Sequence, residues 1–341
     1  MSFRRCAEIA LALCLFTLTL AASNVAAQGV KREPPTLFPV KQNNKWGYID
    51  RTGQLAIPVQ YDAAWDFSEG LAYVKTGASR GVIDKMGRML FQLQQVDIAG
   101  YFTEGLAPVQ TASQPPRFGF IDKAGRIVIN TEYDAVRDFS EGLALVMVGR
   151  LYGFIDKRGR IVIKPQFDKA SSFSEGLALV VVDNKLGFID KTGKLVIKPQ
   201  YNNAYNFSEG LANVALGGSY GCIDKRGAFV IPVQVGYVGS FAEGLAPVIV
   251  SNKFGYIDRA GQQLIKPQFD WATGFSEGLA RVKVGGKSGA KYGFIDRTGQ
   301  LVVPAQFDNA QDFAGGLARV FVGGKQGYID KSGKYVWQPS K

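Results

Sequence analysis

The apolar and polar positions of this chain follow one pattern along almost its whole length, and the stretch 187–220 shows it most clearly. The run 187–189 predicts the end of a first strand, and the Asp-Lys-Thr-Gly after it predicts a tight turn. Aspartate can accept hydrogen bonds from the turning backbone, and glycine tolerates a positive φ. The β-branched residues of 194–198 predict a second strand, which Pro199 should end because proline lacks the N–H needed for pairing. A crossover then leads to a third strand at 211–216.

Two sequence blocks mark the copies of this unit and keep one phase. The block G-[FYVC]-I-D-[KR]-x-G begins at Gly47, Gly81, Gly119, Gly153, Gly187, Gly221, Gly255, Gly293 and Gly327. The block F-x-E-G-L-A begins at Phe67, Phe102, Phe139, Phe173, Phe207, Phe241 and Phe275, and a degenerate copy, F-A-G-G-L-A, begins at Phe313. Most copies are 34 residues apart and two spacings are 38. Such a period predicts a solenoid, a propeller or another repeat array.

The third strand of each unit indicates how the units pack. In 177–182 the sequence Leu-Ala-Leu-Val-Val-Val has no apolar and polar alternation, so both faces of the strand should be covered. A lone three-stranded unit cannot bury both faces, and its stability must come from its neighbours. The two expansions, in 110–118 and 285–291, lie just before the next repeat glycine, as expected for loops.

We therefore predict an all-β fold, an open, solenoid-like superhelical array of about nine three-stranded antiparallel repeats. A closed β-propeller is the alternative. A four-stranded blade usually takes about 40 to 45 residues, more than this period supplies. Nine blades also exceed the usual range of about 4 to 8.

The repeat blocks resemble a known family. Lys45 and Trp46-Gly47-Tyr48-Ile49-Asp50, the D-[KR]-x-G turn, the I-x-P-Q-[YF]-D segment and F-S-E-G-L-A are similar to WG (KWG) repeats, which are bacterial β-rich arrays. The resemblance covers the chain from Lys45 to about Gln338. Most units replace the tryptophan by another residue, which argues against a function for the tryptophan itself. The resemblance implies an extracytoplasmic or interaction-type repeat protein and supplies no catalytic residues.

The N-terminus has the pattern of a secretory signal peptide. Arg4 and Arg5 precede an apolar run over 9–22, and Val25-Ala26-Ala27 forms a small-residue cleavage site. The run is shorter than the roughly 18 to 20 apolar residues that span a bilayer, which disfavours a membrane anchor. A lipoprotein at Cys14 is a weaker reading, because the residue before it is not small. We divide the chain into a signal peptide (1–27), a lead-in linker (28–44), the WG-type repeat array (45–338) and a C-terminal tail (339–341). We expect a periplasmic or extracellular protein whose mature chain has no transmembrane segment.

Composition argues against an enzyme. The chain has no histidine, which removes the usual base of Ser-His-Asp and Cys-His catalysis and the commonest zinc ligand. Of its three cysteines only Cys222 lies outside the signal peptide, and it occupies a slot held elsewhere by aromatic residues, so we interpret it as a buried apolar filler. We expect no cofactor and no catalytic residue.

Carboxylates recur in register and suggest, at first sight, a calcium ladder or a glycosidase pair. The aspartates are Asp50, Asp84, Asp122, Asp156, Asp190, Asp224, Asp258, Asp296 and Asp330. The glutamates are Glu69, Glu104, Glu141, Glu175, Glu209, Glu243 and Glu277. Each aspartate stands where a turn requires one, the dense spacing of a calcium loop is missing, and a catalytic pair is normally present once. We interpret both sets as folding signals and predict no metal site.

Cations are the better candidates for binding, because burial does not explain them. The formal net charge is +11, which favours anionic partners. A period of two places the cations at each end of a second strand on one face. The predicted basic ridge comprises Arg126, Lys157, Arg158, Arg160, Lys164, Lys191, Lys194 and Lys198. A possible aromatic surface comprises Tyr152, Tyr220 and Phe254, although packing between units is the simpler interpretation of these residues.

From these features we expect an exported, non-catalytic scaffold that binds a protein or an anionic glycan at the bacterial envelope. Export makes nucleic acid a poor fit. The alternatives are an envelope enzyme or enzyme inhibitor that acts on cell-wall sugar, and a purely structural spacer.

Overall fold

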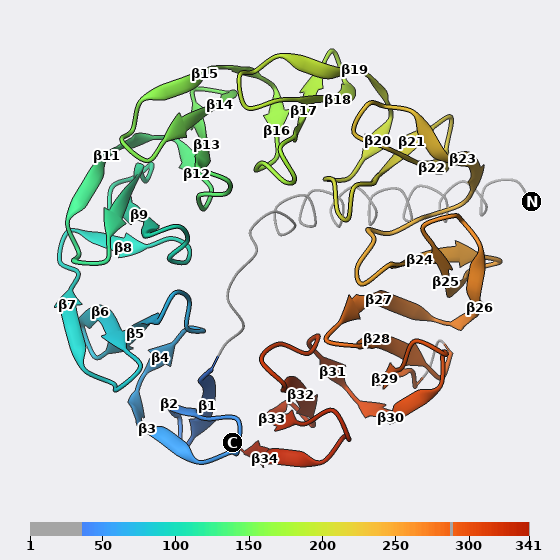
Figure 1. The fold of residues 1–341 in the computed structure, drawn as a ribbon. Coiled ribbons are helices and arrows are strands. Elements are labelled where there is room, and N and C mark those ends of the chain that lie inside the picture. The colour runs from blue at the N-terminus through green and yellow to red at the C-terminus, as the bar shows by residue number, and fades with distance from the viewer. Residues whose placement is uncertain (1–35, 287–288, 341) are drawn as a thin grey trace, which may run out of the picture.

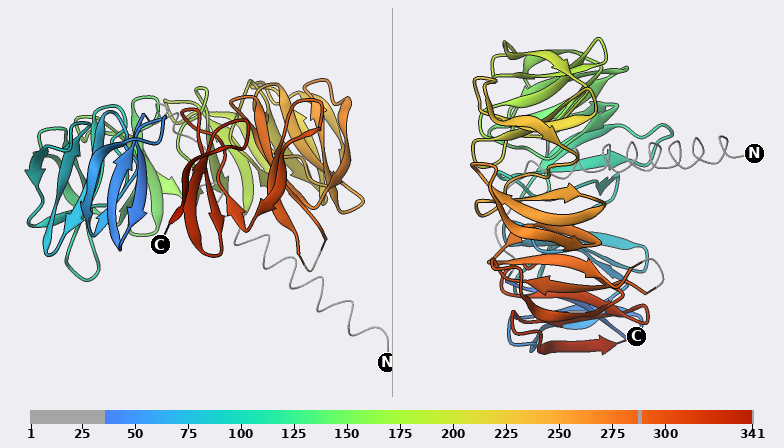
Figure 2. Two further views of the ribbon diagram at one scale, coloured as in Figure 1. Left: turned by 90° about the horizontal axis from the view of Figure 1, so that it is seen from below. Right: turned by 90° about the vertical axis from the view of Figure 1, so that its right-hand side faces the viewer.

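The computed structural model describes residues 36–286 and 289–340. Nine antiparallel sheets lie side by side in a closed ring (Figure 1). Seen from the side, the ring is a disc that is one blade thick (Figure 2). The prediction of an open superhelix is therefore wrong, and the fold is the alternative, a nine-bladed β-propeller. The signal peptide predicted at 1–27 lies outside the described residues.

The blades follow the chain order. Blade 1 contains β1 (Phe38–Gln42), β2 (Lys45–Ile49) and β3 (Leu55–Tyr61). Blade 2 contains β4 (Ala63–Ala64), β5 (Leu71–Thr76), β6 (Ser79–Asp84) and β7 (Met89–Gln92), and blade 3 contains β8 (Val96–Ile98), β9 (Leu106–Thr111), β10 (Phe118–Asp122) and β11 (Ile127–Tyr133). Blade 4 contains β12 (Ala135–Val136), β13 (Leu143–Val148), β14 (Leu151–Asp156) and β15 (Ile161–Phe167), and blade 5 contains β16 (Lys169–Ala170), β17 (Ala178–Val182), β18 (Lys185–Ile189) and β19 (Leu195–Tyr201).

The remaining blades repeat this order. Blade 6 contains β20 (Asn203–Ala204), β21 (Ala212–Leu216), β22 (Ser219–Ile223) and β23 (Phe229–Val235), and blade 7 contains β24 (Leu245–Val250), β25 (Lys253–Asp258) and β26 (Gln263–Phe269). Blade 8 contains β27 (Trp271–Ser276), β28 (Leu279–Val284), β29 (Lys291–Ile295) and β30 (Leu301–Phe307), and blade 9 contains β31 (Asn309–Ala310), β32 (Ala318–Val322), β33 (Lys325–Ile329) and β34 (Tyr335–Ser340). Blade 1 begins at β1, inside the segment expected to be a lead-in linker.

The very short inner strand of most blades explains why the sequence favoured an open array over a propeller. In most blades the strand nearest the ring centre has two residues, as in β20 of blade 6. Four strands therefore fit into 34 residues, and the usual size of a blade is no obstacle. The predicted three-stranded unit also crosses a blade boundary, because 187–189 and 194–198 belong to blade 5 whereas 211–216 belongs to blade 6.

The predicted turn is confirmed. Asp190 Oδ1 accepts hydrogen bonds from the backbone N–H groups of Thr192 (2.9 Å) and Lys194 (3.1 Å), and Gly193 has a φ of +86°. The prediction that Pro199 ends the outer strand is wrong, since β19 continues to Tyr201. The register shifts between the pairs Leu186–Tyr201 and Phe188–Ile197, so β19 bulges around the proline, and a bulge tolerates a residue without an N–H. A second register shift leaves Val196 as the extra residue between Leu195 and Ile197.

Neighbouring blades pack through apolar clusters, as the third strand led us to expect. Phe188 of blade 5 meets Phe207 of blade 6 edge to face, with ring centroids 4.9 Å apart. Both rings are almost completely buried and share one cluster with Ile197 and Val214. Such a cluster exists between successive blades round the ring, so each blade depends on both of its neighbours.

Candidate functional site

The predicted basic ridge lies on the outer rim of the ring. Lys164 and Lys198 lie in β15 and β19, the outermost strands of blades 4 and 5, and Arg126, Arg160 and Lys194 directly precede β11, β15 and β19 (Figure 1). Lys164, Lys194 and Lys198 are exposed, whereas Ile163 and Ile197, which directly precede Lys164 and Lys198, are buried. The lysines therefore point outward.

The structure divides the ridge into paired and unpaired cations. Arg126 and Arg160 are held by the aspartates of their own turns, with Nη2 to Oδ2 distances of 2.7 Å to Asp122 and 2.6 Å to Asp156. Among the ridge residues, Arg158, Lys164, Lys194 and Lys198 form no ion pair with a residue that the structure describes.

Lys157 and Lys191 turn away from the rim and bind the glutamates of the F-x-E-G-L-A loops. Lys157 Nζ lies 3.0 Å from Glu104 Oε2, and Lys191 Nζ lies 3.1 Å from Glu141 Oε2. Each pair joins one blade to the next. These two lysines therefore belong to a structural contact and are removed from the candidate binding surface.

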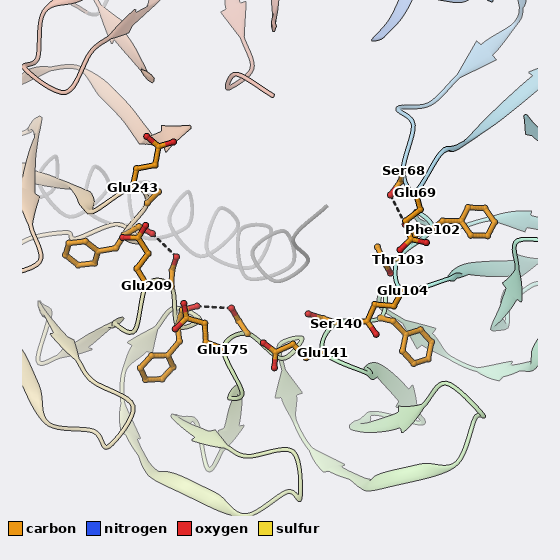
Figure 3. Close-up of a pocket in the computed structure, with 16 residues that line it drawn as sticks. Ser68, Glu69, Phe102, Thr103, Glu104, Ser140, Glu141, Glu175, Glu209 and Glu243 are labelled. Carbon is orange, nitrogen blue, oxygen red and sulfur yellow. Dashed lines mark hydrogen bonds between the residues drawn. The ribbon is translucent and has the colours of Figure 1, made fainter. Parts of the chain in front are cut away.

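The glutamates of blades 2 to 7 form an arc along one mouth of the central opening (Figure 3). Each carboxylate accepts a hydrogen bond from the glycine N–H of the next blade; Gly210 N, for example, lies 2.9 Å from Glu175 Oε2. Lys225 of that blade adds an ion pair to Glu175 at 3.3 Å. We call this arrangement the glutamate clasp. The loops enclose a cavity of about 530 Å³.

The clasp determines the protonation of its carboxylates. Burial alone would raise the pKa of Glu175, but the N–H of Gly210 and the ammonium of Lys225 outweigh it and lower the pKa. The same balance of burial against Lys123 and Gly105 lowers the pKa of Glu69. Both groups are therefore anions at neutral pH and do not have the raised pKa of a general acid. This agrees with the interpretation of the repeated glutamates as folding signals.

Serines of the same loops tie successive blades together. Ser174 Oγ donates a hydrogen bond to the backbone carbonyl of Phe207 at 2.8 Å, and Ser208 Oγ does the same to Phe241 at 2.7 Å. These hydroxyls are therefore engaged by backbone oxygens and are not free nucleophiles.

The opposite face is organised by the aspartate of the I-x-P-Q-[YF]-D segment. Asp62 accepts a hydrogen bond from Gly77 N at 2.6 Å and an ion pair from Lys45 Nζ at 2.5 Å. This contact explains the lysine of the K-W-G motif, which holds in place the segment that connects one blade to the next.

The predicted aromatic surface is largely packing. Tyr152, Tyr220 and Phe254 are half-buried and lie against the apolar clusters between blades. Tyr237 bridges the last two, with ring centroids 5.8 Å from Tyr220 and 6.3 Å from Phe254. These contacts agree with the interpretation of these rings as packing residues.

Cys222 is the buried filler that the sequence suggested. Its thiol donates to Asn213 Oδ1 at 3.2 Å, and burial raises its pKa to about 12, so it is protonated at neutral pH. Among the described residues no three potential metal ligands of the His, Cys, Asp and Glu types gather into one site. No helix in the same residues has the length and apolar character to cross a membrane.

One surface feature escaped the sequence reasoning. Next to the cations, each outermost strand exposes apolar side chains, including Ile161 (56 % exposed) and Val162 (43 %) in blade 4 and Leu195 (43 %) and Val196 (41 %) in blade 5. Strict alternation would have placed one residue of each pair inward. The available signal was the recurrence of this apolar pair after eight of the nine D-[KR]-x-G turns; blade 7 has Gln263-Leu264 instead.

Comparisons with known proteins agree with this architecture. The family described as "WG containing repeat" matches residues 46–78, 81–112, 118–152, 152–185, 187–219, 220–254, 254–287 and 292–325. No curated protein matches the chain.

Solved structures resemble the fold. A crystal structure described as that of the eukaryotic initiation factor has a TM-score of 0.64 at 11% sequence identity, and the alignment covers 88% of this chain and 95% of that one. Kluyveromyces lactis Hsv2p has a TM-score of 0.40 at 11% identity over 66% of this chain and 89% of its own. At such identities the first likeness concerns the fold alone, and the second carries no further weight.

Proposed function

Because the chain belongs to the family of WG-containing repeat proteins, we propose that it is an exported, non-catalytic scaffold that binds a protein or an anionic glycan at the bacterial envelope. The repeat architecture is shown by the family match over most of the chain. Export follows from the signal-peptide pattern of 1–27, and non-catalytic binding follows from the way the recurring polar side chains are used.

The observation that carries the proposal is the contrast between two groups of cations. At the central mouth, Lys123, Lys157, Lys191, Lys225 and Lys331 are each held by a glutamate. On the rim of blades 4 and 5, Lys164, Lys194 and Lys198 are exposed and form no ion pair with a described residue. They contribute little to folding, and they sit on a chain with a net charge of +11, so an anionic partner gains attraction without displacing an internal contact.

The first prediction tests this rim. A variant with Lys164→Glu, Lys194→Glu and Lys198→Glu should lose capture of its partner from envelope extracts. Wild-type binding should weaken as salt rises, because such charges are screened over about 8 Å at physiological ionic strength. Arg160 is left in place because its partner is Asp156.

A matched control separates position from total charge. The triple variant Arg150→Glu, Lys169→Glu and Lys185→Glu changes three exposed cations of the same two blades that lie away from the outer strands. It should bind as wild type does. Both variants should keep the wild-type circular dichroism, since surface substitutions usually alter stability by no more than about 0.5 kcal/mol each. Equal capture by the two variants would show that the rim is only a solvated surface.

A further inference from the structure

The outer strands of blades 4 and 5 combine exposed apolar pairs with cations on both sides. Blade 4 reads Arg160-Ile161-Val162-Ile163-Lys164 and blade 5 reads Lys194-Leu195-Val196-Ile197-Lys198. The outer strands of the other blades expose apolar residues as well, but in the sequence none of them has a cation at both ends. The two charged copies are on neighbouring blades (Figure 1).

A bulge explains why both residues of each pair are exposed. In blade 4, Phe154 pairs with Ile163 and Ile155 pairs with Ile161, so Val162 is the extra residue between two paired ones. A bulge twists the strand and removes the strict alternation of its faces. It also disrupts the edge on which a foreign strand would pair. Recognition at this edge therefore depends on side chains more than on the backbone.

We propose, resting on the binding function above, that the partner at this surface is an acidic polypeptide segment that carries apolar side chains. Its carboxylates meet Lys164, Lys194 and Lys198, and its apolar side chains cover the exposed pairs of β15 and β19. On both blades an exposed apolar pair stands beside at least one lysine that forms no ion pair with a described residue. One segment can therefore bind twice, which raises its effective affinity.

Other anionic partners fit this surface less well. A charged glycan supplies anions but would place hydroxyl groups against Ile161 and Leu195, where it gains little from apolar contact. A flat membrane can reach only a small part of a curved rim, whose successive blades face different directions (Figure 1).

The second prediction separates apolar recognition from charge. The variant with Thr at Ile161, Val162, Leu195 and Val196 keeps every cation. Its affinity for a synthetic peptide of alternating Glu and Leu should fall at least about tenfold, which corresponds to about 1.4 kcal/mol. Its affinity for a peptide of alternating Glu and Ser, and for a sulfated polysaccharide, should change less than about twofold. Isothermal titration calorimetry measures all three.

The control variant carries Phe229→Thr, Val230→Thr, Leu301→Thr and Val302→Thr, which remove four similarly exposed apolar residues from outer strands that have no cation at either end. It should bind the Glu-Leu peptide as wild type does.

Three outcomes would overturn the inference. The first is that the apolar variant binds the Glu-Leu peptide as wild type does. The second is that wild type binds the Glu-Ser peptide or the polysaccharide as tightly as the Glu-Leu peptide, and the third is that phosphatidylglycerol vesicles compete best. If the lysine reversal still abolishes partner capture in these cases, the proposed binding function stands and only the nature of the partner is wrong. If the reversal has no effect, the binding function fails as well.

Discussion

Gly187 shows how a single repeated residue supports the fold. Its backbone φ is not in the left-handed region, so backbone conformation does not require glycine. Space does: a Cβ at this position would lie 2.6 Å from the carbonyl oxygen of Ile197 and 2.7 Å from the nitrogen of Pro199. The bulged outer strand passes directly over the glycine. Gly47, Gly81, Gly119, Gly153, Gly221, Gly255 and Gly293 contact the outer strand of their own blade in the same way, which explains the glycine of the repeat motif.

The third prediction follows from this contact. Gly187→Ala should lower the free energy of unfolding by at least about 2 kcal/mol, because the backbone atoms in the way cannot move aside as a flexible side chain could. Gly289→Ala is the matched control, since nothing lies within 4 Å of its added Cβ, and it should stay within about 0.5 kcal/mol of wild type. Urea unfolding monitored by circular dichroism measures both. A tolerated alanine at 187 would show that the strand over it can move.

The fourth prediction concerns the pH dependence of the glutamate clasp. A carboxyl group whose pKa is lower in the folded state stabilises the fold above its unfolded pKa, and this stability is lost as the pH falls through the folded pKa. The pKa of Glu175 is lowered from 4.5. The stability of the protein should therefore be constant near neutral pH and decline below about pH 4.5, with the turn aspartates adding to the decline as their lowered pKa values are reached.

The variant Glu175→Gln isolates one clasp. It should be less stable than wild type at pH 7 by up to about 1 kcal/mol, because the amide no longer attracts Lys225. The difference should shrink below pH 4.5, where wild type also becomes neutral at this position. Glu132→Gln, which changes an exposed glutamate outside the clasp, should give no pH-dependent difference. Thermal unfolding at several pH values provides the test, and a constant difference for Glu175→Gln would argue against the clasp.

At the scale of single elements, local chemistry was readable from the sequence and the assembly of strands was not. The turn at Asp190 follows from residue types at fixed positions, and the structure has it. The two-residue strand β20 could not be seen, because two residues show no periodicity. The continuation of β19 past Pro199 also depends on a bulge, which arises only when two strands pair with unequal numbers of residues.

The candidate surface divides in the same way. Lys194 and Lys198 are both exposed, as a period of two suggests, although Lys194 lies just before β19 and the bulge at Val196 interrupts the period. The ion pair between Lys191 and Glu141, which removes Lys191 from the binding surface, could not be predicted. The two residues are far apart in the sequence and come into contact only when neighbouring blades pack against each other. Exposure of Leu195 beside Val196 again depends on the bulge. Local patterns thus predict where a side chain points, whereas its contacts with other blades depend on how the ring assembles.

At the scale of the whole molecule, the degenerate repeat of blade 9 marks the place where the ring closes. In blades 2 to 8 the loop glutamate accepts a hydrogen bond from a glycine N–H of the next blade. Blade 1 follows blade 9 round the ring, and the sequence before Leu37 has no F-x-E-G block. A glutamate in the loop of blade 9 would have no such partner, and Gly315 stands in its place.

The closing interface uses other contacts. Among residues 36–286 and 289–340 no strand is shared between the first and last blades, and side chains of blade 9 make the contacts that join them. Tyr328 OH and Gln326 Nε2 both donate to the carbonyl of Pro39, at 3.0 and 2.7 Å. Arg319 reaches past blade 1, and its Nη2 lies 2.6 Å from Asp66 Oδ1 of blade 2. Blade 1 has no inner strand among the described residues. The ion pair to blade 2 therefore takes the place of the contact that Arg281 of blade 8 makes with its neighbour, blade 9.

The fifth prediction is that the ring opens first at this interface. Blades elsewhere are held together by the chain itself, so a broken contact re-forms quickly, whereas blades 9 and 1 separate once their side-chain contacts fail. Asp66→Ala leaves Arg319, whose side chain is only 16% exposed, without its carboxylate, and an uncompensated, largely buried charge is costly. Hydrogen exchange should therefore accelerate at β1 and β33.

The matched control is Asp312→Ala. It removes the equivalent partner of Arg281 between blades 8 and 9, where the Nε to Oδ1 distance is 3.1 Å. That variant should accelerate exchange only locally, because the chain still joins its two blades. Equal exchange at β1 and β33 in both variants would mean that the closing interface is no weaker than the others.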